Sequence, residues 1–327
     1  MIRFRLLAAG LLLTAQPGHS EALRLALPLD CLLGESCFIQ NYVDTDPGPG
    51  AVDFACGGLT YDGHKGTDFA LPSFAAMAAG VTVRAAAPGV VRAARDGMAD
   101  TGRDGTPAEE LAGRECGNGV VIDHGGGWES QYCHLMEGSV TVRRGARVAT
   151  GTPLGKVGYS GLTEAPHLHL SLRKEGAVVD PFAPDGPPVC DLDIAPGDTM
   201  WLDPIGYVPG GIIATGAAPG VPEYDAIKAG RAGHPSLPSD APALVGWAYL
   251  FGVRMGDVVE IEIVQPDDMI WHRHEIVFEQ AFAQAFRASG KRRPAEGWQA
   301  GDWRILTRLL RAGEQISGAE TRVTIRP

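Results

Sequence analysis

Three short fragments, far apart in the chain, carry histidines and an aspartate that only certain folds can bring together. They are His64-Lys65-Gly66-Thr67-Asp68, Tyr132-Cys133-His134-Leu135 and His167-Leu168-His169. A catalytic zinc ion needs three protein ligands of the histidine or carboxylate type and one open position for water. The fragments supply one such set with histidines to spare. We therefore expect a metallohydrolase whose fold gathers all three fragments at one zinc site.

The first fragment is a weak signal when it is taken alone. Gly63 and Gly66 argue against a regular helix, so His64 and Asp68 would have to converge through a turn. An imidazole and a carboxylate both bind zinc well. The alternative is a loop histidine that is hydrogen-bonded to a nearby aspartate, and the fragment by itself favours that alternative.

The third fragment is more specific, because residues two apart in a strand point to the same face. His167 and His169 can therefore address one site. His272 and His274 have the same spacing, but the second half of the chain has no matching His-x-x-x-Asp fragment. We expect this second pair to be surface residues.

The stretch from Cys116 to Cys133 predicts two strands folded about the glycines at 125–127. A hairpin centred there places the two cysteines almost opposite each other, and we expect them to be bonded. In the returning strand Tyr132 and His134 should share one face while Cys133 points to the other. This geometry would let His134 face a cleft.

The N-terminus has the pattern of a secretory signal peptide. Two arginines in the first five residues precede an apolar run, residues 6–15, that is too short to span a bilayer. Small residues near position 22 suit cleavage before Leu23, so residues 1–22 are the expected signal peptide. We expect no transmembrane segment later in the chain. The mature protein should be exported, to the periplasm or the extracellular space.

Six cysteines, all beyond that cleavage point, fit an oxidising compartment. Beyond the Cys116–Cys133 pair, three connectivities are open for the remaining four cysteines. Among Cys31, Cys37, Cys56 and Cys190, the Cys31–Cys37 pairing is mildly favoured by proximity.

Short alternating stretches punctuated by glycine and proline predict a mostly β fold with antiparallel sheets. In the first half, strands are expected at residues 81–84, 89–92, 120–123, 130–135, 139–142, 153–158 and 167–172, with an insertion-like loop at 95–115.

The character of the sequence changes near residue 191. Proline, glycine and alanine dominate residues 191–242, which are expected to be a linker or the start of a second domain. Residues 243–327 should form a smaller immunoglobulin-like β-sandwich domain, with strands at 245–253, 258–264, 303–310 and 321–325. One helix is expected within it, because one helical face would carry Phe278, Phe282, Ala285 and Phe286.

Six motifs occur in the order seen in the lysostaphin/LytM-type zinc metallopeptidases, and the chain resembles that family over residues 60–182. The motifs are Gly63-His-Lys-Gly-Thr-Asp68, Ala85-Ala-Ala-Pro-Gly-Val90, Gly117-Asn-Gly-Val-Val-Ile-Asp-His-Gly125, Tyr132-Cys-His-Leu135, Gly155-Lys-Val-Gly158 and Pro166-His-Leu-His169.

The resemblance implies an antiparallel β-sheet metallopeptidase domain with a groove, at residues 23–190. It implies Zn²⁺ as the cofactor, with His64, Asp68 and His169 as metal ligands and His134 and His167 as catalytic residues. Many relatives follow the His-x-His with an aromatic residue and a glutamate, where this chain has Leu170 and Ser171. That departure removes no ligand.

Members of the family mostly cut peptide cross-links of bacterial cell walls, so the expected substrate is a peptidoglycan peptide and the expected activity is that of a zinc metalloendopeptidase. The alternatives are a secreted metalloprotease acting on proteins and a non-catalytic envelope or peptidoglycan-binding regulator. The net charge of −11 argues against a nucleic-acid partner, because an acidic protein repels phosphate.

Overall fold

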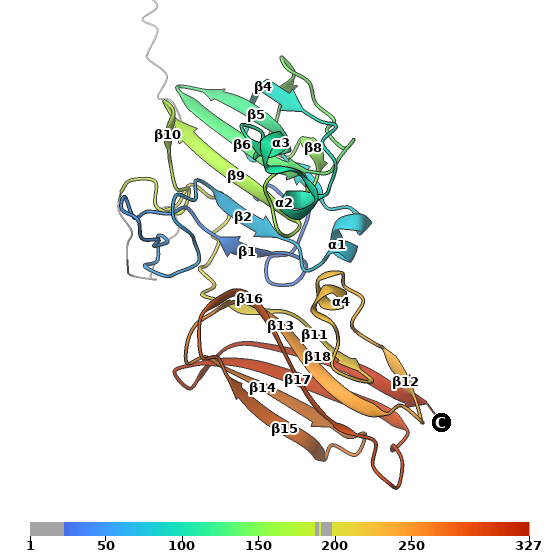
Figure 1. The fold of residues 1–327 in the computed structure, drawn as a ribbon. Helices are drawn as coiled ribbons and strands as arrows, with labels where there is room; N and C mark the ends of the chain where they lie inside the picture. Colours follow the sequence, from blue (N-terminus) through green and yellow to red (C-terminus); the bar gives the residue numbers. More distant parts are fainter. Residues whose placement is uncertain (1–22, 187–189, 191–197, 327) are drawn as a thin grey trace, which may run out of the picture.

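A computed structural model describes residues 23–186, 190 and 198–326. The expected signal peptide lies outside the described residues. The chain forms two β-rich lobes, an N-terminal lobe built from residues 23–186 and a C-terminal lobe built from residues 211–326 (Figure 1). No helix in the described ranges is long and apolar enough to cross a membrane.

The N-terminal lobe is organised around one eight-stranded sheet in the order β1-β2-β9-β6-β5-β4-β7, with β10 paired to β9. Every pairing in this sheet is antiparallel. Its strands are β1 (Phe38–Asn41), β2 (Thr67–Ala70), β4 (Gly89–Arg95), β5 (Asn118–Gly125), β6 (Trp128–Leu135), β7 (Arg147–Val148), β9 (His167–Lys174) and β10 (Ala177–Val178). A separate pair is formed by β3 (Thr82–Arg84) and β8 (Pro153–Lys156).

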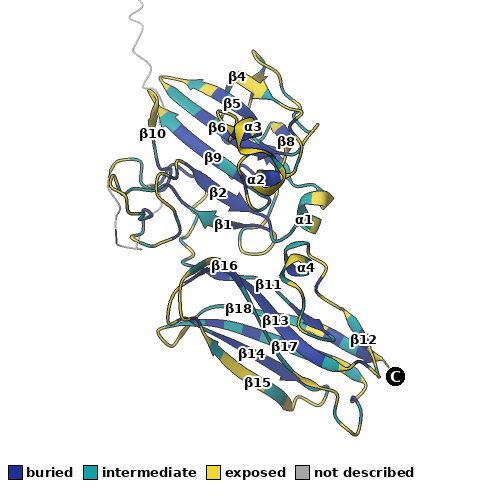
Figure 2. Ribbon diagram, viewed as in Figure 1, coloured by how far each residue is buried: buried dark blue, intermediate teal, exposed yellow. Residues whose placement is uncertain are grey.

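Strand β9 shows how this sheet separates a core face from a site face. Leu168, Leu170 and Leu172 are buried in the hydrophobic core of the N-terminal lobe. The alternate residues His167 and His169 therefore project from the opposite face, as strand geometry requires. Figure 2 shows the buried residues following the strands of both lobes, with exposed residues concentrated in the connections.

Helices in the N-terminal lobe are short: α1 (Phe74–Ala79), α2 (Gly102–Gly105) and α3 (Ala108–Leu111). The last two lie in the segment expected to be a plain loop, so that loop contains two single helical turns. Residues 139–142, expected to be a strand, carry no strand pairing.

Three disulfides join the six cysteines. Cys116–Cys133 and Cys31–Cys37 confirm the two pairings expected from the sequence. The third bond joins the remaining two cysteines and thereby links the loop before β2 to position 190.

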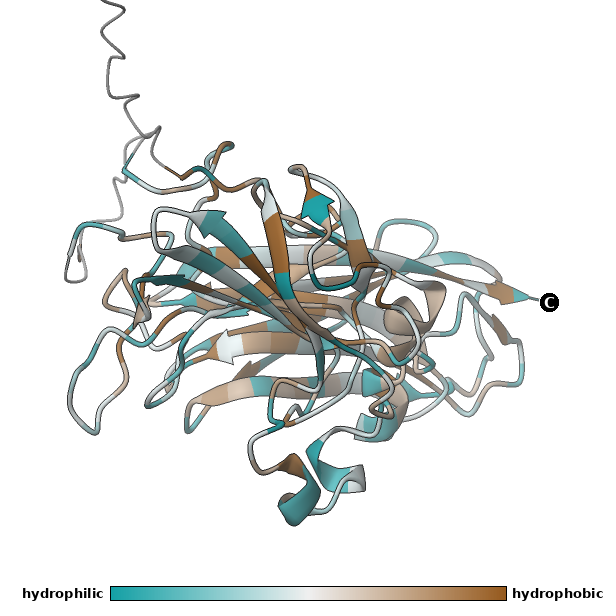
Figure 3. Ribbon diagram, turned by 90° about the horizontal axis from the view of Figure 1, so that it is seen from above, coloured by the Kyte–Doolittle hydropathy of each residue, from teal (hydrophilic) through white to brown (hydrophobic). Residues whose placement is uncertain are grey.

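The C-terminal lobe holds a three-stranded sheet, β11-β13-β16, and a five-stranded sheet, β12-β18-β17-β14-β15. The strands are β11 (Gly211–Ala218), β12 (Ser236–Pro238), β13 (Ala243–Val253), β14 (Val258–Val264), β15 (Ile270–Val277), β16 (Phe282–Arg292), β17 (Gly301–Arg311) and β18 (Glu314–Arg326), with one helix, α4 (Tyr224–Lys228). Because β11 and β12 pair within these sheets, the lobe extends back into the proline- and glycine-rich range. Figure 3 shows the molecule from above, with hydrophobic and hydrophilic residues interspersed along the chain.

The helix expected around residues 278–286 is wrong. Residues from Phe282 onward form β16, which pairs antiparallel with β13 over its whole length. The spacing of three aromatic residues fits a helical face equally well, but the backbone hydrogen bonds and side-chain packing offered by the neighbouring strand decide the conformation. The mostly β, antiparallel character of the fold is confirmed, whereas the immunoglobulin-like assignment stays a prediction.

Candidate metal centre

Asp68 and His169 are brought together by strand register. Strands β2 and β9 pair so that these two residues lie directly opposite each other, on the site face of the sheet. His169 Nδ1 lies 2.8 Å from Asp68 Oδ1. His64, in the turn before β2, completes the group, with its Nε2 atom 3.2 Å from Asp68 Oδ1 and 3.1 Å from His169 Nδ1. These three residues form a group that could hold a metal ion.

In each of these three residues, the polar atom that points away from the group forms a hydrogen bond with a neighbouring residue. His64 Nδ1 donates to the Tyr42 carbonyl oxygen at 2.6 Å, and His169 Nε2 contacts the Ser171 hydroxyl at 2.9 Å. The second oxygen of Asp68 accepts a hydrogen bond from the Asn41 amide at 3.0 Å. Such outer contacts fix the tautomer and orientation of metal-binding histidines.

This arrangement fits a bound cation. When His64 donates from Nδ1 and His169 donates from Nε2, the nitrogens that face each other both present lone pairs. Together with the Asp68 oxygen they form three electron-rich atoms within about hydrogen-bond distance and with no proton between them. Two imidazoles and one carboxylate are ligands that zinc prefers. The donor set therefore matches the zinc site expected from the sequence.

The electrostatics of the cluster favour an ionised Asp68. Burial alone would raise the pKa of this carboxyl, but the neighbouring imidazoles of His167, His64 and His169 hold its pKa well below the ordinary value. Burial lowers the pKa of His169 despite the nearby carboxylate. The ionised Asp68 and the neutral His169 suit metal binding. At His64, by contrast, burial lowers the pKa but the nearby Asp68 carboxylate outweighs it and raises the pKa.

His134 and His167 lie beside this group. Their ring centroids are 4.7 Å apart, and His167 Nε2 is 3.5 Å from Asp68 Oδ1. His134 Nδ1 donates to the Ser160 carbonyl oxygen at 2.8 Å, and His167 Nδ1 donates to that of Ala165 at 2.9 Å. In both rings Nε2 is thus left as the nitrogen that can accept a proton.

The route by which His134 reaches the site differs from the one expected. Cys133 pairs with His169 and so lies on the site face, whereas Tyr132 pairs with Leu170 and is buried in the core. Strict alternation would turn His134 toward the core as well. Its backbone, however, adopts a positive φ of 63°, which breaks the alternation and returns the ring to the site. The expected location was correct, but the parity argument for it was wrong.

The second His-x-His pair, His272 and His274, lies on β15 of the C-terminal lobe. Both rings contact the Ser289 hydroxyl, at 2.7 Å and 2.9 Å. His274 is exposed and His272 is half-buried. Neither residue joins the metal-binding group.

Sequence reasoning missed the partners that hold the site. Tyr42 and Ser160 act through backbone carbonyls, for which side-chain motifs carry no signal. Asn41 precedes the first motif by more than twenty residues. Ser171 could have been found, because it lies two residues after His169 on the same strand face.

Residues 62–181 match the model of peptidase family M23. The chain carries an M23 peptidase domain. Within that domain lie all five site residues, in the arrangement described above. The sequence-based assignment to the lysostaphin/LytM type is thereby confirmed.

Two curated relatives share this M23 domain. Peptidoglycan DD-endopeptidase ShyA of Vibrio cholerae is 31% identical over 117 residues, which is 36% of this chain and 22% of ShyA. DD-carboxypeptidase/endopeptidase Mpg of Neisseria meningitidis is 34% identical over 122 residues, 37% of this chain and 22% of Mpg. The chain therefore spans less than a quarter of the length of these relatives.

Among solved structures, the catalytic domain of the prophage-encoded M23 protein EnpA from Enterococcus faecalis matches with a TM-score of 0.33 and 23% identity, covering 47% of this chain and 96% of that one.

Proposed function

We propose that this protein is an exported zinc-dependent endopeptidase that hydrolyses peptide cross-links of peptidoglycan. The observation that carries the proposal is the convergence of His64, Asp68 and His169 on one point, with two further histidines beside them. The relatives named for peptidoglycan endopeptidase activity support the substrate class.

In this proposal His64, Asp68 and His169 hold the zinc ion. A zinc ion held there would polarise a bound water and the scissile carbonyl group. Asn41 and Ser171 orient two of the ligands by hydrogen bonds to Asp68 and His169. Two of the three ligands, Asp68 and His169, thus lie on paired strands, and His64 lies in the turn that leads into β2.

His134 and His167 move protons. Burial, reinforced by the neighbouring His167 and His169, holds the pKa of His134 well below its ordinary value, so its ring is neutral at neutral pH. A neutral imidazole can take the proton of the attacking water at Nε2. The second histidine, when it carries a proton on Nε2 as well, can then stabilise the oxyanion or protonate the departing amine. The peptide bond is cleaved without a covalent intermediate.

The remaining regions complete the proposal. Residues 1–22 would direct export and be removed, and residues 23–190 would hold the peptidase domain. Residues 191–242 would lead into the immunoglobulin-like domain, which continues through residues 243–327. The three disulfides support an oxidising, periplasmic or extracellular location.

Digestion of purified sacculi tests the function. The full mature chain, with its zinc content measured, is incubated with sacculi and in parallel with an unfolded protein, and the fragments are identified by mass. Release of peptide fragments from sacculi by the wild type, but not by Asp68→Ala, is expected. Cleavage of the unfolded protein alone would instead indicate a general metalloprotease. Bound zinc without any cleavage would indicate a non-catalytic binding protein.

A further inference from the structure

Strand β1 lies between the metal-binding group and the C-terminal lobe. It is the edge strand of the eight-stranded sheet, paired only with β2. Its other edge faces the C-terminal lobe (Figure 1). An edge strand depends on whatever covers it, because half of its backbone groups have no partner strand.

On its inner side, β1 supports two of the three proposed metal ligands. Asn41 lies opposite Asp68 in the strand register and donates its side-chain amide to the Asp68 carboxylate at 3.0 Å. The next residue, Tyr42, accepts the His64 Nδ1 proton on its carbonyl oxygen at 2.6 Å. A displacement of β1 would therefore move the partners of both ligands together.

On its outer side, β1 is held by the C-terminal lobe. The Phe38 and Phe251 rings pack with their centroids 4.6 Å apart. The Gln284 side-chain amide donates to the Gln40 side-chain oxygen at 2.6 Å. Phe251 on β13 and Gln284 on β16 lie directly opposite each other, so they form one contact surface.

Phe251 is unusual in its packing. Although it belongs to the C-terminal lobe, it is 4% exposed and forms part of the hydrophobic core of the N-terminal lobe. Continuous packing with a core residue transmits displacement, because protein interiors are close-packed.

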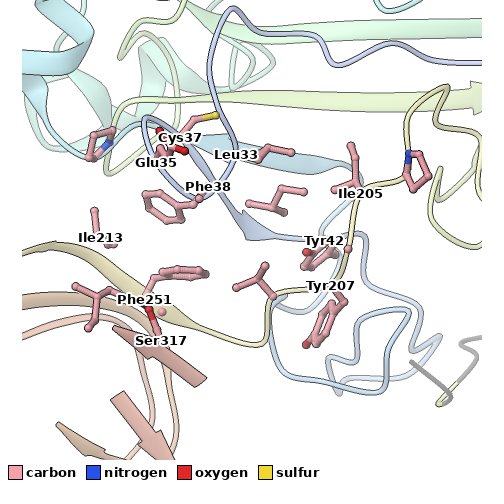
Figure 4. Close-up of a pocket in the computed structure, with 18 residues that line it drawn as sticks. Leu33, Glu35, Cys37, Phe38, Tyr42, Ile205, Tyr207, Ile213, Phe251 and Ser317 are labelled. Carbon is pink, nitrogen blue, oxygen red and sulfur yellow. Dashed lines mark hydrogen bonds between the residues drawn. The ribbon is translucent and has the colours of Figure 1, made fainter. Parts of the chain in front are cut away.

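The interface also contains a cavity. It has a volume of about 350 Å³ and is lined by residues of both lobes, among them Phe38, Tyr42, Tyr207 and Phe251 (Figure 4). Beside this cavity the Phe38–Phe251 and Gln40–Gln284 contacts join β1 to the C-terminal lobe. Both contacts can be removed by single substitutions.

We propose that the C-terminal lobe sets the position of the metal ligands through β1, with Gln284 and Phe251 as positioning residues. The inference rests on the proposed function, since it takes His64 and Asp68 as zinc ligands. It gives the C-terminal lobe a role in the affinity of the metal site.

Zinc affinity of the full chain, measured by competition with a chelator, tests this inference through a double-mutant cycle. Gln284→Ala and Gln40→Ala are each expected to weaken zinc binding roughly 2- to 30-fold, the range seen for residues that modulate a distant site. The double variant should be no weaker than either single variant, because both substitutions break the same contact. Gln284→Asn, which keeps the amide but shortens the side chain, should weaken binding in the same direction.

The chain offers a matched control. The Gln265 and Gln299 side chains form another glutamine–glutamine hydrogen bond, at 3.3 Å, within the C-terminal lobe. Gln299→Ala should leave zinc affinity unchanged, and thermal melting of each variant shows that it is folded. Asn41→Ala serves as the direct comparison, with an expected loss of about 10- to 100-fold.

The outcomes separate the inference from the proposed function. A wild-type protein that binds no zinc would refute the ligand assignment itself. A wild type that binds zinc, combined with Gln284→Ala and Gln284→Asn variants within about twofold of it, would overturn the role of the C-terminal lobe. The inference would also be overturned if the losses of zinc affinity in Gln40→Ala and Gln284→Ala multiplied in the double variant. An equal loss of zinc affinity in Gln299→Ala would overturn it as well.

Discussion

Asp180 is a buried carboxyl whose ionisation opposes folding. It lies two residues after the end of β10 and is 7% exposed. Its Oδ1 atom accepts a hydrogen bond from the Phe182 backbone at 2.8 Å, whereas its Oδ2 atom has no partner. Burial raises the pKa of Asp180 to about 7, and the negative charge of Asp53 acts in the same direction.

The sign and size of the effect follow from linkage. Between its ordinary value of 3.8 and about 7, Asp180 stays protonated in the folded protein while it ionises in the unfolded chain. The folded state binds more protons in this interval, so the free energy of unfolding falls as pH rises. At about 1.36 kcal/mol per pH unit, the full interval corresponds to about 4 kcal/mol. The stability associated with this group is complete below pH 3.8 and is lost as pH rises through about 7.

Asp180→Asn removes the ionisable group and keeps its shape. Urea unfolding of the variant and the wild type, both with zinc removed by a chelator, should show the variant gaining about 4 kcal/mol relative to the wild type from about pH 4 to pH 8. Taking the difference between the two proteins cancels the titration of groups that do not interact with Asp180. Two parallel stability curves would show that Asp180 ionises normally in the folded protein and would refute the reasoning.

Three further predictions concern the site. Asp68→Ala should lose bound zinc, because two ligands remain, and full zinc retention in metal analysis would exclude this residue as a ligand. His134→Ala should keep its zinc but lose at least about a hundredfold in turnover, while His272→Ala stays near wild type; loss of zinc in the first variant would make that histidine a ligand. Selective reduction of the Cys116–Cys133 bond should lower stability by about 2–4 kcal/mol and slow hydrolysis, because the His134 amide donates to the Cys116 carbonyl oxygen; unchanged melting and turnover would contradict this.

Strands such as β4, β5, β6, β9, β13, β14 and β17 could be predicted because their pattern is local, whereas β1, β2, β11 and β15 were missed. Alternating apolar residues between glycine- and proline-rich turns specify a strand from its own sequence. The segment containing Phe282 and Phe286 shows the limit of this approach. The spacing of its aromatic residues is compatible with a helix and with a strand. Pairing with β13, which is distant in sequence, decides for the strand.

The site was predictable to the extent that it consists of side chains in short motifs. His64, Asp68, His167 and His169 lie where the spacing requires. His134 lies beside the site as expected, but the strand-parity argument for that position was wrong. No sequence pattern predicts a positive φ at a non-glycine residue.

The partners of these residues explain why the rest could not be predicted. His64, His134 and His167 each donate a ring proton to a backbone carbonyl, and any residue can supply a carbonyl. The information that fixes the tautomers therefore resides in the path of the loops, which depends on the whole fold. For His64 that path runs through Tyr42 at the end of β1, and β1 is covered by the C-terminal lobe. If this cover positions the strand, then part of what defines the metal site is encoded more than 180 residues after its first ligand, at Phe251 and Gln284.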